Sequence, residues 1–367
     1  MSNLDLPKTK FTGYDYSQLE INAKVLAVFK DGAEVSELNE GDDAVVILDE
    51  TPFYAESGGQ VGDTGVITIG ESRFAVTDTK KTAKGQYLHF GTVEMGGLGK
   101  GDSVTASVNV EKRYAIMRNH TAAHLLQAAL RKVLGDHVHQ AGSYVDAERC
   151  RFDFSHFEAV TPEQLSEIEA IVNKDIFDAI PVTMTEMPIE EAKKLGAMAL
   201  FGEKYGNIVR VVEANGVSVE FCGGTHIDNT ARLGLFKIIG ENSVASGIRR
   251  IEAVTGSGVL KLLNEVENRV REAAHILKVG DMSQLAEKIT SVIETNKGLE
   301  KLNEAFKKRI ADGVFEEVLR NCREVNGVKV MANMLTNVGS DMYDKFADRV
   351  KEIEEPFIIL IAGTADE

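Results

Sequence analysis

Two short motifs each place two side chains that bind transition metals four residues apart. The first is His120-Thr121-Ala122-Ala123-His124, and the second is Cys222-Gly223-Gly224-Thr225-His226, well downstream in the chain. Together they supply three imidazoles and one thiolate, which form a tetrahedral ligand set suited to Zn²⁺. We therefore expect one zinc ion per chain, bound by His120, His124, Cys222 and His226.

The first motif alone is a weak indication of a metal site, because two histidines on a helix surface show the same spacing without any ion. The combination is stronger, since it provides four ligands in two correctly spaced pairs. A metalloprotease of the HExxH type is disfavoured, because Thr121 occupies the place where that motif has a glutamate base.

The elements around both motifs can position these ligands. The segment from Asn119 to Leu134 has the pattern of an amphipathic helix, and Gly135 is suited to end it. Residues four apart share one face of a helix, so both histidines of the first motif can reach one ion. The alternating run Val217–Phe221 predicts a strand, and the two glycines after Cys222 allow a sharp turn that returns His226 toward the thiolate.

Composition narrows the class of protein. The 367 residues suffice for two or three domains, and the net charge of −16 argues against a non-specific nucleic-acid binder. No apolar run approaches the roughly 20 residues of a membrane span, so we expect no membrane association. Three cysteines make no disulfide framework, and the N-terminus lacks the features of a signal peptide, so we expect a cytoplasmic protein.

Local basic patches could still contact RNA. For each patch the alternative is an ordinary solvated surface. The candidate patches are Lys80, Lys81 and Lys84, Arg113 and Arg118, Lys193 and Lys194, Arg249 and Arg250, and Lys307, Lys308 and Arg309.

The pattern along the chain predicts an α+β protein in four parts. Residues 1–105 are rich in short strands separated by glycines, which is typical of a small β-barrel. Residues 106–256 mix helices and strands and carry both metal motifs. Residues 257–312 are helical, and residues 313–367 show the strand, helix, strand pattern that opens an α/β domain. Because the chain stops just after the second of these strands, we expect a fragment of a longer protein.

The helical part contains a heptad-like apolar seam on one long helix. Its members alternate in steps of four and three, and Val259 to Leu277 could form an antiparallel partner. A helical hairpin and a dimerising coil, which would give a homodimer, both remain open. The seam residues are Leu285, Ile289, Val292, Asn296, Leu299, Asn303, Phe306 and Ile310.

A glycine-rich loop interrupts the strand-rich part. Within Glu56 to Gly65, the residues Glu56, Ser57, Gly58 and Gly59 could expose backbone N–H groups to an anion or carboxylate. An ordinary turn would have the same composition. The loop lacks the GxxxxGK[ST] sequence, so it is not a P-loop.

Several segments closely resemble alanyl-tRNA synthetase, from the middle of that family's sequence onward. The match covers nearly the whole chain and implies an editing domain, a helical linker and the start of the C-terminal domain. The aminoacylation domain, which binds ATP, would lie upstream, so the chain itself is not expected to bind ATP. The segments are Thr51–Gln60, Asn119–Leu126, Gln140–Ser143, Arg151–His156, Gly196–Tyr205 and Cys222–His226.

The resemblance implies hydrolysis of tRNA for alanine that has been mischarged with serine or glycine, at the acceptor end. It identifies the four metal-binding side chains as the family's zinc ligands, and Gln140 and Ser143 as polar residues beside the ester. Ala123 departs from the threonine often found there in the family. Another residue would therefore have to contact the hydroxyl of the serine substrate. Together with the patterns above, the catalytic candidates are Gln140, Ser143 and Cys222, and the substrate-binding candidates are Glu56, Ser57, Gly58, Gly59, Thr225, Arg249 and Arg250.

Two versions of the chemistry and two alternative functions stay open. Zinc could position the terminal ribose or amino group, with one ligand displaced or the coordination expanded. Zinc could instead only build the pocket, while a water held by Gln140, backbone N–H groups and an RNA 2′-OH attacks the ester. Finally, the chain could be a zinc-stabilised tRNA-binding module without activity, or a free-standing editing protein.

Overall fold

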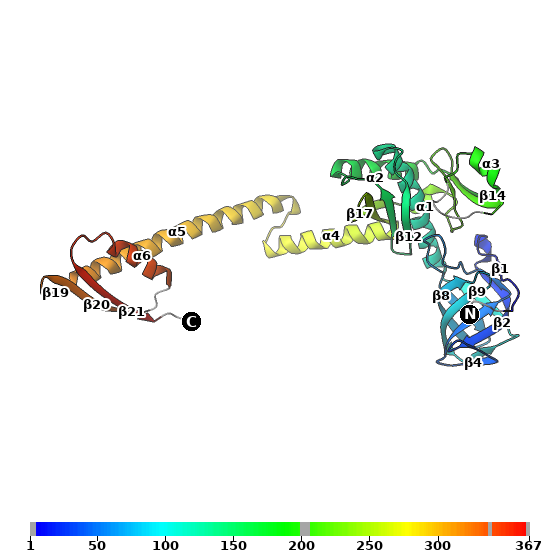
Figure 1. Cartoon of the computed structure of the whole chain (residues 1–367), viewed down its shortest axis with the longest axis horizontal. Helices are drawn as coiled ribbons and strands as arrows, with labels where there is room; N and C mark the ends of the chain where they lie inside the picture. Colours follow the sequence, from blue (N-terminus) through cyan, green and yellow to red (C-terminus); the bar gives the residue numbers. More distant parts are fainter. Residues whose placement is uncertain (1–4, 199–205, 337–339, 365–367) are drawn as a thin grey trace. The chain divides into compact units, whose positions relative to one another are not determined.

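The structure is a computed structural model that describes residues 5–198, 206–336 and 340–364 (Figure 1). Part of the predicted family segment 196–205 thus lies outside the described residues. Residue contacts divide the chain into two compact units, Met1–Asn264 and Glu265–Glu367. No helix in the described ranges is long and apolar enough to cross a lipid bilayer.

The first unit begins with the predicted β-barrel, coloured blue to cyan in Figure 1. Its strands follow the order β11-β7-β8-β9-β5-β2, and β2 pairs with β11 to close the sheet. Alternate side chains of these strands, among them Val28, Val46 and Phe74, fill the barrel and are almost completely buried. The barrel strands are β2 (Glu20–Lys30), β5 (Asp43–Leu48), β7 (Gly65–Ile69), β8 (Ser72–Lys81), β9 (Tyr87–Met95) and β11 (Ser103–Val108).

Short elements decorate the barrel. The strand β1 (Lys10–Phe11) pairs in parallel with β6 (Glu50–Thr51), and β3 (Ala33–Val35) extends the edge of β2. The strands β4 (Glu37–Asn39) and β10 (Gly97–Gly99) pair with each other. A 3-10 turn, η1 (Tyr16–Gln18), leads from β1 into β2.

The helix that carries the first metal motif is α1 (Val110–Leu134). It begins earlier than the predicted Asn119, because Asn109 is the N-cap and its side chain accepts a hydrogen bond from the Lys112 N–H. Gly135 ends the helix with φ of +113°, as expected for glycine at this place.

The first turns of α1 join the helix to the barrel through a buried ion pair. Arg113 is 0 % exposed, and its Nε lies 3.0 and 2.9 Å from the two carboxylate oxygens of Asp63. It also donates hydrogen bonds to the carbonyl oxygens of Gly13 and Pro52. The sequence left open an RNA-binding patch or a solvated surface for Arg113, and both are wrong because the guanidinium is fully enclosed.

A four-stranded antiparallel sheet lies beside α1, with the order β12-β13-β18-β17. Its strands are β12 (Gln140–Val145), β13 (Cys150–Ser155), β18 (Ile248–Thr255) and β17 (Phe236–Ala245). Both α1 and α2 (Pro162–Phe177) contact this sheet, around a core that includes Leu125, Phe152 and Ile168. Thr161 caps α2 and Pro162 is its first residue, as predicted.

A second, three-stranded sheet presents the other metal motif. It consists of β14 (Val182–Pro188), β15 (Ile208–Ala214) and β16 (Ser218–Phe221) in that order. The predicted hairpin between β15 and β16 is confirmed, and Gly216 in its turn has φ of +76°. The helix α3 (Ile189–Lys194) packs on this sheet, and η2 (Thr230–Leu233) follows the metal motif.

The first unit ends within helix α4 (Ser257–Ile276), and the second unit continues with η3 (Met282–Gln284) and α5 (Leu285–Arg320). The predicted end near residue 312 is wrong, because α5 continues through Gly313. The predicted helix is confirmed by α5. Its apolar seam side chains Ile289, Leu299 and Phe306 are 41 to 58 % exposed, and a hairpin or a dimer stays a prediction.

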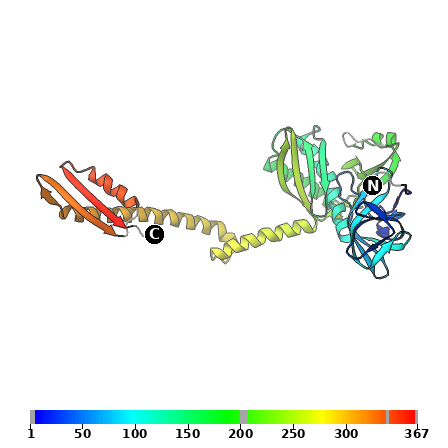
Figure 2. The same ribbon diagram turned by 60° about the horizontal axis from the view of Figure 1, so that its bottom comes forward.

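The predicted strand, helix, strand pattern at the C-terminal end is confirmed. The strands β20 (Val328–Thr336) and β21 (Phe357–Thr364) are parallel and connected by α6 (Ser340–Val350), while β19 (Arg323–Val325) forms a hairpin with β20. Phe315, Val318, Met331 and Phe346 form the small core where α5 and α6 pack on this sheet (Figure 2). The division of the chain into four domains stays a prediction.

Candidate metal centre

The fold brings the two predicted ligand pairs together. His120 and His124 project from one face of α1, and Cys222 and His226 belong to the loop that follows β16. One ligand atom from each of the four residues lies within 4.8 Å of the others. This group could hold a metal ion, and its members are those that the sequence predicts.

The spacing around Cys222 agrees with tetrahedral coordination. Its Sγ lies 3.4 Å from Nε2 of His120 and 3.3 Å from Nε2 of His226. Metal bonds of about 2.0 Å to nitrogen and about 2.3 Å to sulfur place such atoms about 3.5 Å apart on a tetrahedron. The donor set and its geometry therefore fit Zn²⁺, the ion that the sequence predicts.

The three imidazoles are in the state that binds metals. Burial lowers the pKa of His124 to about 3, and burial followed by neighbouring positive charge lowers the pKa of His120 and His226 well below 6.5. Metal binding requires a neutral imidazole with a free lone pair. The enclosure of the site thus keeps its histidines available at neutral pH.

Gln60, from the glycine-rich barrel loop, orients His120. Its Oε1 lies 2.8 Å from the Thr225 N–H nitrogen and 2.8 Å from Nδ1 of His120, and its Nε2 donates to the Thr225 hydroxyl at 3.0 Å. An amide oxygen only accepts, so Nδ1 of His120 carries the proton and Nε2 is left to face Cys222. Gln60 is 0 % exposed and was not predicted, because nothing in the local sequence links it to a helix sixty residues away.

His124 and His226 also have polar neighbours outside the ligand group. The Thr121 hydroxyl lies 3.1 Å from Nδ1 of His226. Oε2 of Glu220 lies 3.6 Å from Nε2 of His124, and the Ser218 hydroxyl donates to the other oxygen of Glu220. Burial raises the pKa of Glu220 to about 8. Glu220 is a second residue that sequence reasoning missed.

Side chains from other parts of the first unit donate hydrogen bonds to backbone carbonyls of the Cys222–His226 loop. Arg210 donates to the carbonyl oxygens of Cys222 at 2.9 Å and Gly224 at 2.7 Å, and its guanidinium lies 4.1 Å from the Tyr14 ring centroid. Tyr14 donates its hydroxyl to the carbonyl oxygen of Gly223 at 2.6 Å, and the Tyr16 hydroxyl bonds to the carbonyl of His226. The barrel segment before β2 therefore helps to shape the metal loop.

The second glycine of this loop is required by space. A Cβ on Gly224 would lie 2.0 Å from Cε1 of His120, which is far inside van der Waals contact. Any side chain at this position would push the histidine out of the ligand group. The sequence predicted a glycine turn here, and the structure adds the reason for it.

The predicted catalytic candidates lie on the neighbouring sheet. Gln140 begins β12, opposite Phe154 on β13, and Ser143 lies three residues further along the strand. A Cβ on Gly59 would lie 2.4 Å from the Ser143 carbonyl oxygen, so the glycine-rich loop packs directly against this strand. No hydrogen bond in the described structure joins Gln140 or Ser143 to the four ligands, and their catalytic roles stay predictions.

The loop residues Glu56, Ser57, Gly58 and Gly59 form a turn that Ser57 and Gln60 close. Gly58 and Gly59 have φ of +59° and +82°, which favours glycine at both positions. The predicted alternative of an ordinary turn thus agrees with the backbone, and the turn also delivers Gln60 to the metal centre. Thr225 is 1 % exposed and bonds to Gln60 through both its N–H and its hydroxyl.

The two arginines predicted to bind substrate are already paired with carboxylates. Arg249 forms an ion pair with Glu241 at 2.5 Å, and Arg250 forms one with Asp153 at 2.7 Å. Both pairs join adjacent strands of the four-stranded sheet. Their role in binding a substrate stays a prediction.

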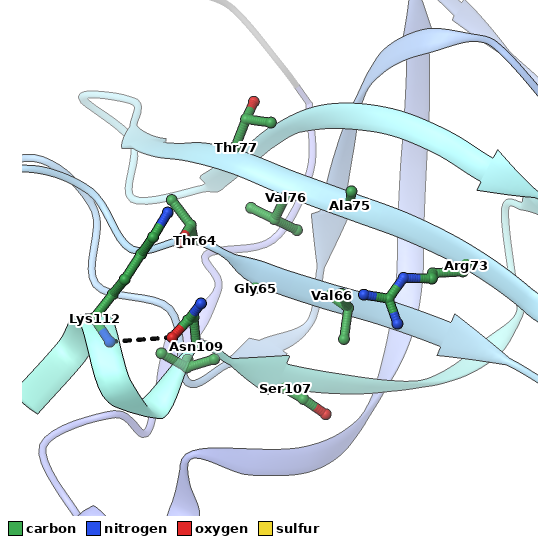
Figure 3. Close-up of a pocket in the computed structure, with 11 residues that line it drawn as sticks. Thr64, Gly65, Val66, Arg73, Ala75, Val76, Thr77, Ser107, Asn109 and Lys112 are labelled. Atoms are coloured by element: carbon green, nitrogen blue, oxygen red, sulfur yellow. Dashed lines mark hydrogen bonds between the residues drawn. The ribbon is translucent and has the colours of Figure 1, made fainter.

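A separate cavity of about 400 Å³ lies on the barrel, between β7, β8 and the start of α1 (Figure 3). Its lining includes Arg73, Thr77 and Ser107, together with Asn109 and Lys112. None of the four metal ligands borders it, so this cavity is not the metal centre.

Two family models match the chain. The model "tRNA synthetases class II (A)" matches residues 2–112, and the model "Threonyl and Alanyl tRNA synthetase second additional domain" matches residues 209–252. The first match covers the barrel and the second includes Cys222 and His226. The metal centre therefore combines residues from the second matched region with His120 and His124, which lie between the two.

Curated relatives are similar over nearly the whole chain. The alanine–tRNA ligases of Pseudomonas syringae pv. tomato and Pseudomonas savastanoi pv. phaseolicola are both 46 % identical, over 98 % of this chain and 42 % of their own length. That of Acetivibrio thermocellus is 46 % identical over 94 % of this chain and 40 % of its own length. The chain spans about two fifths of the curated relatives it matches. The predicted resemblance is thus confirmed: the chain is related, over nearly its whole length, to part of the alanyl-tRNA synthetases.

Proposed function

We propose that this chain hydrolyses the ester of tRNA for alanine that carries serine or glycine. The observation that supports it most directly is the four-residue group of His120, His124, Cys222 and His226. It is enclosed and correctly spaced, and it lies partly in the region that matches a synthetase additional domain. The relatives named as alanine–tRNA ligases identify the tRNA that such an activity would concern.

The need for hydrolysis follows from the limits of binding. A pocket shaped for alanine rejects glycine, which lacks one methyl group, by only about 1–3 kcal/mol, and an apolar pocket tolerates the extra hydroxyl of serine. A second site with polar groups can discriminate serine from alanine much better, because alanine would leave those groups unpaired. Editing therefore requires polar partners for the serine hydroxyl near the metal centre.

The residues in place offer such partners. Ala123 is buried in α1 and has no polar atom to contribute. The Thr225 hydroxyl accepts from Gln60 and still has its own proton to donate. The glycine-rich loop and Ser143 lie against each other, which brings two further candidates to one place. We therefore assign the hydroxyl contact to Thr225, Ser143 or the Glu56–Ser57 turn, with Gln140 holding the attacking water.

Zinc held by His120, His124, Cys222 and His226 would supply a positive centre that orients the terminal ribose or amino group. Four neighbouring side chains would orient the ligands and the metal loop. Gln60 and Thr121 fix the ring orientation of two histidines, and the two barrel tyrosines Tyr14 and Tyr16 hold the loop carbonyls. Burial of the site excludes bulk water, so only a positioned water can attack.

The test is to mix purified protein with Ser-, Gly- and Ala-charged tRNA for alanine and to follow loss of the ester. We expect rapid hydrolysis of the first two and slow hydrolysis of Ala-tRNA. Four protein ligands close a zinc shell as in structural sites, which favours a binding module as the alternative. Equal hydrolysis of Ser-tRNA and Ala-tRNA by protein loaded with zinc would contradict editing and favour that alternative.

A further inference from the structure

Three exposed lysines gather at one edge of the barrel, and we name them the lysine cluster: Lys8, Lys81 and Lys84. Lys81 ends β8 and its Nζ lies 5.3 Å from the Tyr87 ring centroid. A Cβ on Gly85 would lie 2.8 Å from Cγ of Lys8, so Lys8 runs along the turn that contains Lys84. The charges of Lys8 and Lys81 act on each other, and Lys84 lies next to Gly85 in the turn that Lys8 follows, so the three residues share one edge of the barrel.

The lysine cluster differs in its charge partners from Lys10, Lys30 and Lys100, although Lys24 on β2 also forms no ion pair among the described residues. Lys10, Lys30 and Lys100 form ion pairs with Glu50, Asp42 and Glu34 respectively. None of the ion pairs within the described residues includes a member of the lysine cluster. In a chain with a net charge of −16, an unpaired group of three positive charges indicates an anionic partner.

The electrostatics of Lys81 support this view. Partial burial, and after it the charge of Lys8, lower the pKa of Lys81. Two like charges beside each other repel, and a phosphate between them would remove that repulsion. Binding of a polyanion would therefore reduce the repulsion between the positive charges of the cluster.

Aromatic side chains connect the lysine cluster to the metal loop. Tyr87, beneath Lys81, stacks on Phe11 with ring centroids 5.6 Å apart. Phe11 meets Tyr14 edge to face at 4.8 Å, and the Tyr14 hydroxyl donates to the carbonyl oxygen of Gly223 in the metal loop. Tyr14 is 38 % exposed. A row of contacts therefore links Lys81 to the metal loop through Tyr87, which is only 7 % exposed, and then through Phe11 and Tyr14 nearer the surface.

We propose that the lysine cluster binds backbone phosphates of the unpaired 3′ strand of a tRNA acceptor end, and that the Phe11–Tyr14 row leads this strand to the metal loop. A single strand suits the site because its phosphates and bases can follow a narrow basic and aromatic track. This inference rests on the proposed function for the identity of the RNA, and it adds the path by which the ester reaches the metal centre.

The experiment uses the full chain and two RNA hairpins, one with the single-stranded 3′ overhang of tRNA for alanine and one cut flush at the stem. Binding is measured by fluorescence anisotropy over a series of salt concentrations. The variant Lys8→Ala/Lys81→Ala/Lys84→Ala is compared with Lys10→Ala/Lys30→Ala/Lys100→Ala, which removes the same charge from the same barrel. Zinc content and thermal unfolding verify that both variants keep the fold.

For the overhang hairpin, loss of three phosphate contacts on a single strand should reduce the slope of log K against log salt by about 2 and weaken binding at least about tenfold. The flush hairpin and the control variant should show no such change. An unchanged slope, an equal loss on both hairpins or an equal loss in the control variant would each overturn the proposal. So would wild-type protein that binds neither hairpin.

These results are separate from the test of editing. If wild-type protein fails to deacylate Ser-tRNA while the overhang is still bound through the lysine cluster, the proposed function fails and the RNA path stands. If wild-type protein deacylates Ser-tRNA while the lysine variant keeps its full affinity for the overhang, the RNA path fails and the proposed function stands.

Discussion

Gln60 of the barrel and His120 of helix α1 share a hydrogen bond of 2.8 Å between Oε1 and Nδ1. The same amide accepts from the backbone N–H of Thr225, so one glutamine connects the barrel loop, the helix and the metal loop. Such a partner fixes the tautomer of a metal-binding histidine and usually contributes strongly to metal affinity. The first matched region therefore supports the metal centre through Gln60, although none of the four ligands lies in it.

Gln60→Ala should reduce zinc affinity by about 10- to 100-fold, because His120 loses the group that orients its ring. Competition with a fluorescent zinc chelator measures the affinity directly. Gln86→Ala is a matched control, since Gln86 is also buried in the barrel and hydrogen-bonded, but to the carbonyl of Leu6. Equal zinc affinity of Gln60→Ala and wild-type protein would show that this hydrogen bond has no role in the metal centre.

Gln140→Ala should slow hydrolysis of Ser-tRNA while zinc remains bound. Gln140 is at the start of β12 and has no hydrogen bond to a metal ligand among the described residues, so its loss leaves the ligand group intact. Single-turnover deacylation and elemental analysis on the same sample measure the two properties. A loss of zinc in this variant would mean that Gln140 supports the metal and not the attacking water.

His89 should make the barrel less stable in acid. Its ring is fully buried, with Nδ1 donating to the Val46 carbonyl at 2.9 Å and Nε2 lying 2.7 Å from the Thr51 hydroxyl. Burial lowers the pKa of His89 to about 4, below its value near 6.5 in the unfolded chain. The contribution of the neutral His89 ring to the free energy of unfolding is therefore fully present above pH 6.5. It falls by about 3 kcal/mol as the pH drops to 4.

The variant His89→Gln tests whether His89 causes this loss of stability in acid, because glutamine keeps a hydrogen-bonding side chain without a titrating ring. Its free energy of unfolding, measured with urea between pH 4 and 7, should depend less on pH than that of wild-type protein. The exposed His275 provides the control substitution His275→Gln. An equally steep decline in His89→Gln would assign the acid sensitivity to other groups.

Removal of one member of the Asp63–Arg113 pair should be costly. Arg113→Met leaves a buried carboxylate without its partner, and such changes typically cost about 3–5 kcal/mol. Arg113→Met/Asp63→Leu should recover much of that loss, because no buried charge remains. Arg73→Met, which breaks the half-exposed pair with Glu94, should change stability very little. Similar stability of Arg113→Met and Arg73→Met in denaturant titrations would contradict this account.

The sequence predicted the four ligands because their spacing is a local property of a helix and of a glycine turn. It could not predict Gln60 or Arg210, since their hydrogen bonds depend on contacts between distant segments. For the same reason it placed Arg113 on the surface: its charge is visible in the sequence, and its enclosed partner Asp63 is not.

Element types were predicted better than element ends. The start of α1 was missed because the N-cap Asn109 lies before a stretch whose own apolar pattern is weak. The end of α5 was missed because Gly313 suggests a break, while the packing of Phe315 and Val318 against the C-terminal sheet keeps the helix continuous. A local N-cap thus set the start of α1, while tertiary packing set the end of α5. The cytoplasmic location and the homodimer remain predictions.

The central claim is that editing depends on this metal centre, and one paired measurement tests it. Zinc content and the rate of Ser-tRNA hydrolysis are determined for wild-type protein, for Cys222→Ala and for the control Cys322→Ala, whose cysteine lies in the second unit. We expect about one zinc per chain and rapid hydrolysis in wild-type protein and the control, and loss of both in Cys222→Ala. Freshly purified, reduced wild-type protein without zinc, or undiminished hydrolysis by Cys222→Ala, would contradict the claim.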